Sequence, residues 1–166
     1  MSAALFAALT IATAAQPPLD PKVRAQLARL FPSATSFSPK AGEPPHFKAY
    51  AGPQVAGYAF WTTELEPLER GFDGPIKILV GLDPKGVLTG IIVADHNEPY
   101  GSWSIEPARF AAQFRGKSIR DPFRVGGDVH AVTRATMTIA SAARAVRNSA
   151  RRVARQLLTP QGPDRR

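Results

Sequence analysis

The stretch IKILVGLDPKGVLTGIIVADHN constrains the fold more than any other part of the chain. Residues 76–82 and 87–94 are two strongly apolar runs, and the sequence DPKG at 83–86 separates them. Proline at the second place of a turn and glycine at the fourth are typical of a type I turn. Two apolar runs around such a turn predict an antiparallel hairpin with at least one face buried in the core.

Three more patterns predict elements around this hairpin. Residues 23–31 have apolar side chains at helical spacing, which predicts a short helix. The runs HFKAYAG and QVAGYAFWTT surround Gly52 and predict a second hairpin. A further short helix is expected to begin near Pro107, with Phe110 and Phe114 on one face. Segments rich in glycine, proline and serine predict loops at 32–46, 67–75, 98–104 and 118–128.

Residues 139–158 predict the longest helix of the chain. Its apolar residues recur at three- and four-residue intervals, and its arginines are expected on the opposite face. The predicted apolar stripe consists of Ile139, Ala142, Ala143, Val146, Ala150, Val153 and Leu157. Together these elements predict an α+β fold: a single domain with an antiparallel sheet flanked by helices and a long C-terminal helix.

The N-terminal residues resemble a targeting segment. The run at 3–15 is apolar and uncharged, but it is shorter than the roughly 20 residues that span a bilayer. The small-x-small sequence ATA at 12–14 is typical of a cleavage site, although no basic residue precedes the run. We therefore predict a signal peptide at 1–16 and an exported, periplasmic location, with an alanine-rich leader as the alternative. The expected division continues as a linker and short helix (17–46), the main domain (47–158) and a basic tail (159–166).

Composition excludes several kinds of chemistry. The chain has 166 residues, no cysteine and a net charge of +8, so thiolate metal sites and a cysteine nucleophile are excluded. The sequence contains no nucleic-acid-binding signature and no aromatic residues among the C-terminal arginines, so no nucleic-acid partner is expected. Asp95, His96 and Glu98 do not have metal-ligand spacing, and no catalytic residue and no metal site are predicted.

The stretch HAVTRATMT places three hydroxyl side chains and a cation just before the long helix. Thr133, Thr136 and Thr138 supply the hydroxyls, and Arg134 supplies the charge. Thr136 or Thr138 is a candidate N-cap residue. A helix N-terminus with hydroxyls and an arginine is equally suited to holding a phosphate group. The residues by themselves leave these two interpretations open.

Four stretches in order resemble FMN-binding domains: GYAF, GFDGPIKILVGLDPKGVLTGIIVADHNEPYG, FAAQFRGK and AVTRATMT. Such domains occur in peripheral subunits of sodium-pumping and Rnf-type electron-transfer complexes and in the exported part of NosR-type regulators. The resemblance covers about residues 49–150 and identifies the domain at 47–158 as an FMN-binding domain.

The resemblance implies that Thr136 carries FMN as a phosphoester, formed by a separate Mg-dependent flavin transferase. The matching motif is Thr133-Arg134-Ala135-Thr136, in which Arg134 replaces the usual glycine and is placed to pair with the phosphate. His130 stands where the transferase's recognition pattern usually has aspartate. Covalent FMN is expected from the motif, and the departure at His130 makes non-covalent FMN the alternative.

Two loops are expected to contact the flavin ring, through Phe72 and Asp73 in one and Glu98, Tyr100 and Gly101 in the other. Glycines allow close approach, and aromatic side chains provide apolar walls. The resemblance places Glu98 near the flavin, and Asp73 where one branch of the family has an aromatic residue. Plain turns with buried aromatics are the alternative interpretation of both loops.

These observations predict an exported flavoprotein that transfers electrons between redox partner proteins, including membrane-bound ones. No side chain is placed as a substrate-specific acid or base, so an electron carrier is expected rather than an enzyme with its own small substrate. The alternative is an FMN-free sensory or scaffolding module of the cell envelope. Its basic C-terminal helix would bind an acidic partner.

Overall fold

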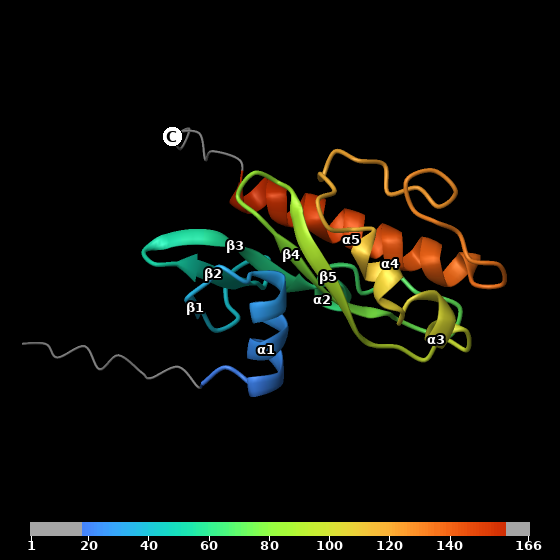
Figure 1. The fold of residues 1–166 in the computed structure, drawn as a ribbon, viewed down its shortest axis with the longest axis horizontal. Coiled ribbons are helices and arrows are strands. Elements are labelled where there is room, and N and C mark those ends of the chain that lie inside the picture. The colour runs from blue at the N-terminus through green and yellow to red at the C-terminus, as the bar shows by residue number, and fades with distance from the viewer. Residues whose placement is uncertain (1–17, 159–166) are drawn as a thin grey trace, which may run out of the picture.

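A computed structural model of the chain describes residues 18–158 (Figure 1). The predicted signal peptide at 1–16 and the predicted basic tail at 159–166 lie outside the described residues. The elements are α1 (Pro21–Leu30), β1 (Ser36–Phe37), β2 (Phe47–Ala51), β3 (Gln54–Trp61), α2 (Thr62–Leu65), β4 (Lys77–Leu82), β5 (Leu88–Asp95), α3 (Gly101–Ser104), α4 (Ala108–Ala112) and α5 (Thr136–Leu157).

The five strands form one antiparallel sheet in the order β1-β2-β3-β4-β5. Both predicted hairpins are confirmed, as β2–β3 and β4–β5. The β4–β5 connection is the predicted turn: the N–H of Gly86 donates to the carbonyl of Asp83 at 3.1 Å, and Gly86 has a φ of +80°. Glycine suits this place because other residues are strained at positive φ. The predicted α+β class is confirmed.

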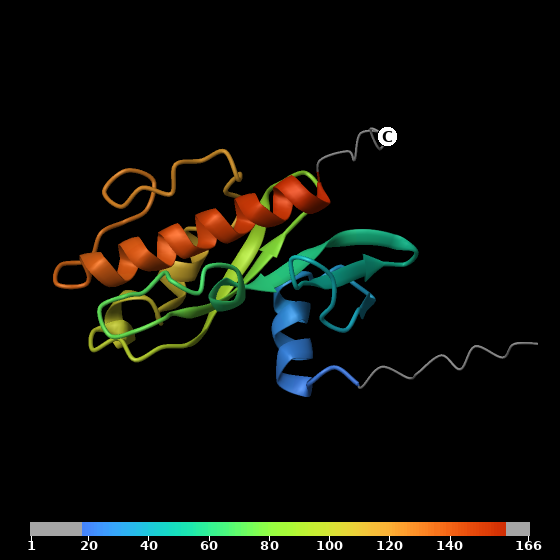
Figure 2. The ribbon, with the colours of Figure 1, turned by 180° about the vertical axis from the view of Figure 1, so that it is seen from behind.

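Helices cover both faces of the sheet, with α5 on one side and α1 on the other (Figures 1 and 2). Side chains alternate along β4: Ile78, Val80 and Leu82 are buried towards α5, whereas Leu79 is buried towards α1. Apolar residues of β4 therefore fill two cores at once, which explains why its sequence is a continuous apolar run rather than an alternating one.

A bare glycine allows α1 to lie close to the sheet. A Cβ atom on Gly57 would come within 2.4 Å of the Phe31 ring and 2.6 Å of the Leu82 carbonyl oxygen. No side chain fits in that space, so the residues that follow α1 require glycine in β3. The segment predicted as a linker and short helix thus contributes Leu27, Leu30 and Phe31 to the core on this face.

Several element boundaries differ from the predictions. Two stretches predicted as loops contain the short strand β1 and the one-turn helix α3. The one-turn helix α2 has no counterpart among the predicted elements. Helix α5 begins at Thr136, three residues before the predicted start at Ile139. Polar residues and glycine in short elements resemble loop sequence, and these elements form because neighbouring strands and helices supply their partners.

Candidate functional site

Glu98 is a buried carboxylate that joins three segments of the chain. It is 6% exposed and lies in the loop that follows β5. It accepts hydrogen bonds from the backbone N–H groups of Phe72, at 3.1 Å, and Asp73, at 3.0 Å. It also accepts a hydrogen bond from the hydroxyl of Thr138, in the first turn of α5. The two predicted ring-contacting loops and the predicted phosphate-binding segment therefore meet at one side chain.

The loop at 71–74 is fitted closely to this carboxylate. A Cβ atom on Gly71 would lie 2.3 Å from Oε1 of Glu98, so only glycine permits the approach. Just before this loop, Glu69 accepts hydrogen bonds from Arg144 on α5, the shorter at 2.7 Å, and these bonds raise the pKa of Arg144. Helix α5 thus holds this loop through two contacts: Arg144 bonds Glu69 directly, and Thr138 bonds Glu98, which in turn bonds the loop.

Exposed apolar side chains lie on the segments that meet at this carboxylate. The side chain of Phe72, whose N–H donates to Glu98, is 68% exposed. The side chain of Met137, which precedes Thr138, is 64% exposed. Tyr100 stacks on Trp103, with ring centroids 5.0 Å apart, and both rings are exposed. An exposed apolar cluster of this kind marks a binding surface. We call these four residues, three aromatic side chains and one methionine, the aromatic rim.

The first turn of α5 presents an exposed hydroxyl beside backbone N–H groups. Thr136 is the first helical residue and its side chain is exposed, whereas Thr138 is buried. The interpretation of Thr136 or Thr138 as the N-cap residue is wrong, because the N-cap is Ala135, which makes no side-chain capping bond. The first turn also contains no acidic residue. Its N–H groups and the positive end of the helix dipole suit an anion.

Arg134 occupies a backbone conformation that favours glycine. Its φ is +69°, and its side chain is exposed. The resemblance places glycine at this position in FMN-binding domains, and glycine adopts a positive φ without strain. Strained backbone conformations of this kind persist mainly at functional sites.

We predict that Arg134→Gly will raise the free energy of unfolding by about 0.5–1 kcal/mol, because it relieves the left-handed strain. Urea denaturation of the flavin-free protein measures the change. Arg134→Ala is the control, because it removes the guanidinium but keeps a Cβ atom at positive φ, so it should not stabilise the protein. Equal stabilisation by both variants would contradict the strain explanation.

Asp128 and His130 have separate roles in the segment before α5. The exposed His130 donates its backbone N–H to Oε1 of Gln113 at 2.7 Å. Asp128 accepts hydrogen bonds from Lys117, at 2.9 Å, and from the backbone N–H of Arg124, at 2.6 Å. Burial would raise the pKa of Asp128, but these bonds outweigh burial and hold it below its ordinary value. Asp128 is therefore engaged in fixing its own loop.

The low pKa of Asp128 predicts a pH-dependent contribution to stability. Because the folded-state pKa is depressed, the contribution is present above about pH 4 and is lost as the pH falls through the folded-state value. Asp128→Asn should lower the free energy of unfolding at pH 7 by about 1–2 kcal/mol, since the carboxylate is partly exposed. Urea denaturation from about pH 7 down to about pH 2.5 should show the two proteins converging in acid. A constant difference would contradict the prediction.

The arginines of α5 are mostly bonded within the chain. Arg151 donates to the carbonyl oxygens of Ile119 and Asp121, and Arg152 donates to the carbonyl oxygen of Leu65. Both are half-buried rather than projecting from the outer face. The predicted apolar stripe is buried except for the half-buried Leu157. A free basic helix face, on which the FMN-free alternative depends, is therefore only partly present.

His96, which the sequence does not predict as a metal ligand, lies beside Glu98. His96 accepts the N–H of Glu98 through Nδ1 at 3.1 Å, and its Nε2 lies 3.2 Å from Glu106. Among residues 18–158, no group of three or more His, Asp or Glu side chains is arranged to hold a metal ion.

Between the same limits, no helix is both long and apolar enough to cross a membrane.

Sequence reasoning missed three residues of this region as parts of the site. The sequence indicates Thr138 as a possible cap or as one of the phosphate-binding hydroxyls, whereas its hydroxyl ties α5 to Glu98. Trp103 and Met137 belong to the aromatic rim. A methionine on the exposed face of a helix, where the other residues are polar, is a signal that was available in the sequence.

Comparisons with known proteins show which proteins this part of the chain resembles. Residues 71–151, which include Glu98, the aromatic rim and Thr136, match the family model of the FMN-binding domain. A 47-residue segment is 45% identical to a subunit of the ion-translocating oxidoreductase complex of Haemophilus influenzae strain Rd. The same subunits from strains PittEE and 86-028NP are 43% identical over 47 residues.

Each of these alignments covers 28% of this chain and 21% of the relative, so the segment spans about a fifth of the proteins it matches. The family match is broader, since it extends from the loop bonded to Glu98 well into α5. Residues 71–151, just under half of the chain, therefore match the family of FMN-binding domains.

Proposed function

We propose that this chain is an exported electron-transfer domain whose FMN is attached through a phosphoester to Thr136. The observation that carries the proposal is the exposed Thr136 hydroxyl at the first position of a 22-residue helix, within the family's matched segment. Its location in the periplasm follows from the leader pattern at 1–16.

The residues around Thr136 fit a phosphate group. The first turn of α5 offers backbone N–H groups with no side-chain cap, and the turn itself contains no acidic residue. Arg134 and Thr133 are exposed in the turn that leads into the helix. A guanidinium beside a helix N-terminus stabilises a phosphodiester by charge and by hydrogen bonding. Ala135, which is buried, fixes the turn against the core.

The aromatic rim fits the flavin ring. An isoalloxazine needs apolar walls with a few polar groups, and Phe72 and Tyr100 are exposed on the two loops that meet at Glu98. In the proposal, Glu98 positions these loops relative to Thr136. Asp73 and Gly101 complete the loops, Asp73 exposed and Gly101 buried against His96.

Attachment requires an activated FMN donor, a flavin dinucleotide. The Thr136 oxygen becomes bonded to the flavin phosphorus, and the bond from that phosphorus to the bridging oxygen breaks, so that a nucleoside monophosphate is the leaving group. The hydroxyl proton departs with the leaving group, so the chain gains the mass of FMN less one molecule of water. A separate flavin transferase is proposed to perform the step, as the family resemblance implies.

When bound, FMN accepts and donates electrons singly or in pairs, and the chain's residues set its access and orientation. No residue of the site is placed as a substrate-specific acid or base. We therefore propose electron transfer between redox partner proteins, in a membrane-associated complex like the one named for the Haemophilus relatives. The rim around the flavin is where a partner would approach.

Intact mass spectrometry tests this proposal. The full chain is expressed with and without a flavin transferase, and the mature proteins are weighed. A gain of FMN less water only with the transferase supports the covalent form. A yellow protein without the gain, which releases its flavin on denaturation, supports non-covalent FMN. A colourless protein of unchanged mass in both cultures would refute FMN binding and favour the scaffolding alternative.

A further inference from the structure

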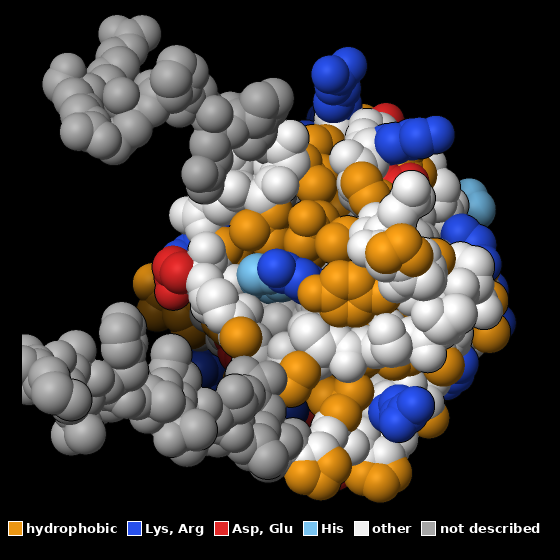
Figure 3. Space-filling view, turned by 90° about the vertical axis from the view of Figure 1, so that its left-hand side faces the viewer, with side chains coloured by type: hydrophobic (Ala, Val, Ile, Leu, Met, Phe, Trp, Pro, Cys, Tyr) orange, Lys and Arg blue, Asp and Glu red, His pale blue; other side chains and the backbone are white. Residues whose placement is uncertain are grey.

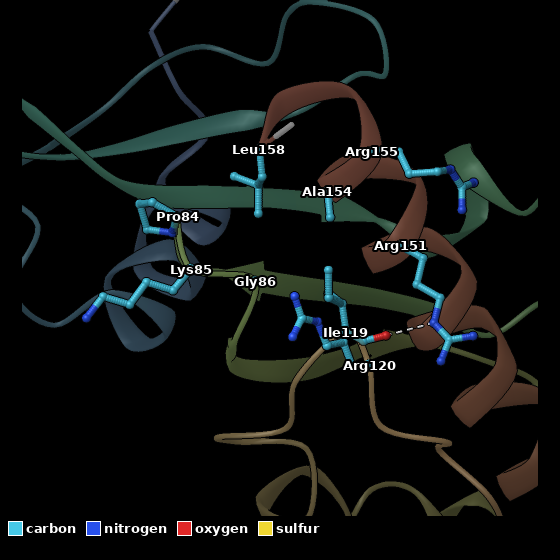
Figure 4. Close-up of a pocket in the computed structure, with 9 residues that line it drawn as sticks. All are labelled: Pro84, Lys85, Gly86, Ile119, Arg120, Arg151, Ala154, Arg155 and Leu158. Carbon is cyan, nitrogen blue, oxygen red and sulfur yellow. Dashed lines mark hydrogen bonds between the residues drawn. The ribbon is translucent and has the colours of Figure 1, made fainter. Parts of the chain in front are cut away.

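A second site lies at the end of α5 far from Thr136. The structure contains a cavity of about 600 Å³ between the β4–β5 turn, the loop at 119–120 and the last turns of α5 (Figure 4). This volume is typical of small-molecule sites. The full length of α5 separates the cavity from the proposed flavin site, because Thr136 begins the helix and Leu158 follows its last residue.

The floor of the cavity is apolar. Leu158 and Ala154 point from α5 towards Ile119 (Figure 4). A Cβ atom on Gly86 would lie 3.2 Å from Cδ1 of Ile119 and 3.9 Å from Cδ1 of Leu158. The bare glycine at the turn therefore leaves this surface uncovered.

The wall of the cavity is cationic. Four of its lining residues are basic and none is acidic. Arg151 is fixed in place, because it donates to the carbonyl oxygens of Ile119, at 2.8 Å, and Asp121, at 2.9 Å. The ion pairs formed among residues 18–158 include none of the other three, Lys85, Arg120 and Arg155.

The surface near the cavity has the same character. Figure 3 shows the end of the molecule at which α5 finishes, where basic side chains stand around exposed hydrophobic ones and few acidic side chains are visible. Cations that line one cavity without carboxylate partners repel one another, and this repulsion is reduced when an anion binds in the cavity.

We propose that this cavity binds a phosphate ester that carries an apolar group. Arg120 and Arg155 line the cavity on opposite sides of Ile119 (Figure 4). Arginine guanidinium groups match the geometry of phosphate oxygens, so we assign the anionic end to these cationic sides of the cavity. The apolar end lies over Ile119, Ala154 and Leu158. Either a soluble organic phosphate or the headgroup region of an anionic phospholipid has this chemistry. The site needs no flavin and is independent of the function proposed above.

Calorimetric titration of the full chain tests the site with two probes, hexyl phosphate and inorganic phosphate. Hexyl phosphate should bind with one-to-one stoichiometry and at least tenfold more tightly than inorganic phosphate, because only the ester covers the apolar floor. The double variant Arg120→Gln/Arg155→Gln should weaken hexyl phosphate binding at least tenfold. The control Lys22→Gln/Arg24→Gln removes two exposed cations from α1 and should change binding less than twofold.

Sedimentation with phosphatidylcholine vesicles, with and without phosphatidic acid, separates the two sources of the ligand. Binding to the anionic vesicles that is lost in the Arg120/Arg155 variant identifies a lipid headgroup. Binding of hexyl phosphate without vesicle binding identifies a soluble phosphate. No binding in either assay, or equal losses in the site and control variants, overturns the proposal. Thr136→Ala should retain full binding, which separates this result from failure of the flavin proposal.

Discussion

Thr136→Ala is expected to abolish covalent flavin attachment completely. The alanine variant lacks the only atom that the proposed phosphoester uses, so co-expression with a flavin transferase should give a chain without added mass. The protein should still fold with nearly the same stability, because the Thr136 side chain is exposed and makes no capping bond. Intact mass and in-gel flavin fluorescence measure attachment, and circular dichroism measures folding.

Two variants make this result specific to one hydroxyl, and a third tests the residue at position 130. Thr136→Ser keeps a hydroxyl at the same helical position and should still accept the flavin. Thr133→Ala removes the other exposed hydroxyl of the motif and should leave attachment intact. If the wild-type protein is only partly loaded, His130→Asp should raise the loaded fraction, since it restores the residue usual at that place. Loss of attachment in Thr133→Ala with retention in Thr136→Ala would assign the tether to Thr133.

Glu98→Ala is expected to produce the largest loss of stability in the site, about 3 kcal/mol of the free energy of unfolding. The change leaves the part-buried N–H groups of Phe72 and Asp73 and the buried hydroxyl of Thr138 without their acceptor. Each donor left unsatisfied costs about 1–3 kcal/mol, and partial entry of water reduces the sum. Urea denaturation gives the change in stability, and amide hydrogen exchange at Phe72 and Asp73 should accelerate.

The matched control for this prediction is Thr138→Val, which removes one of the three donors and retains the shape of the side chain. It should cost about 1 kcal/mol, and the double variant should lose less than the sum of the single changes, because the two residues share a bond. Glu98→Gln should be intermediate, since its amide oxygen still accepts from the backbone. A loss below about 0.5 kcal/mol for Glu98→Ala, with unchanged exchange at Phe72 and Asp73, would contradict the central role of this carboxylate.

Sequence patterns predicted the parts of the fold that depend on local chemistry. The two hairpins were predictable because apolar runs and turn residues lie next to each other along the chain, as at the DPKG turn. The long helix was predictable from its apolar repeat. Its start was misplaced by three residues, because the threonines that resemble a loop are held in helical conformation by packing and by the bond from Thr138 to Glu98.

The candidate site was predictable only in pieces. The motif that contains Thr136 and the loop that contains Glu98 were identified from resemblance, but nothing in the sequence showed that Glu98 bonds the loop at 71–74. Phe72 and Glu98 are 26 positions apart in the chain, and Glu98 and Thr138 are 40 apart. Contacts at such separations depend on how the sheet and α5 assemble, which local propensity does not encode.

By itself, the sequence determined the main elements, the resemblance to a family and the residue types available for chemistry. The glycine of the turn at 83–86 and the arginine and threonines just before the long helix could be recognised from their neighbouring residues. Only the tertiary structure decided that one carboxylate joins three segments, that Arg134 is strained, and that four basic residues line a cavity with an apolar floor. Burial and the pairing of charges depend on which distant segments pack together.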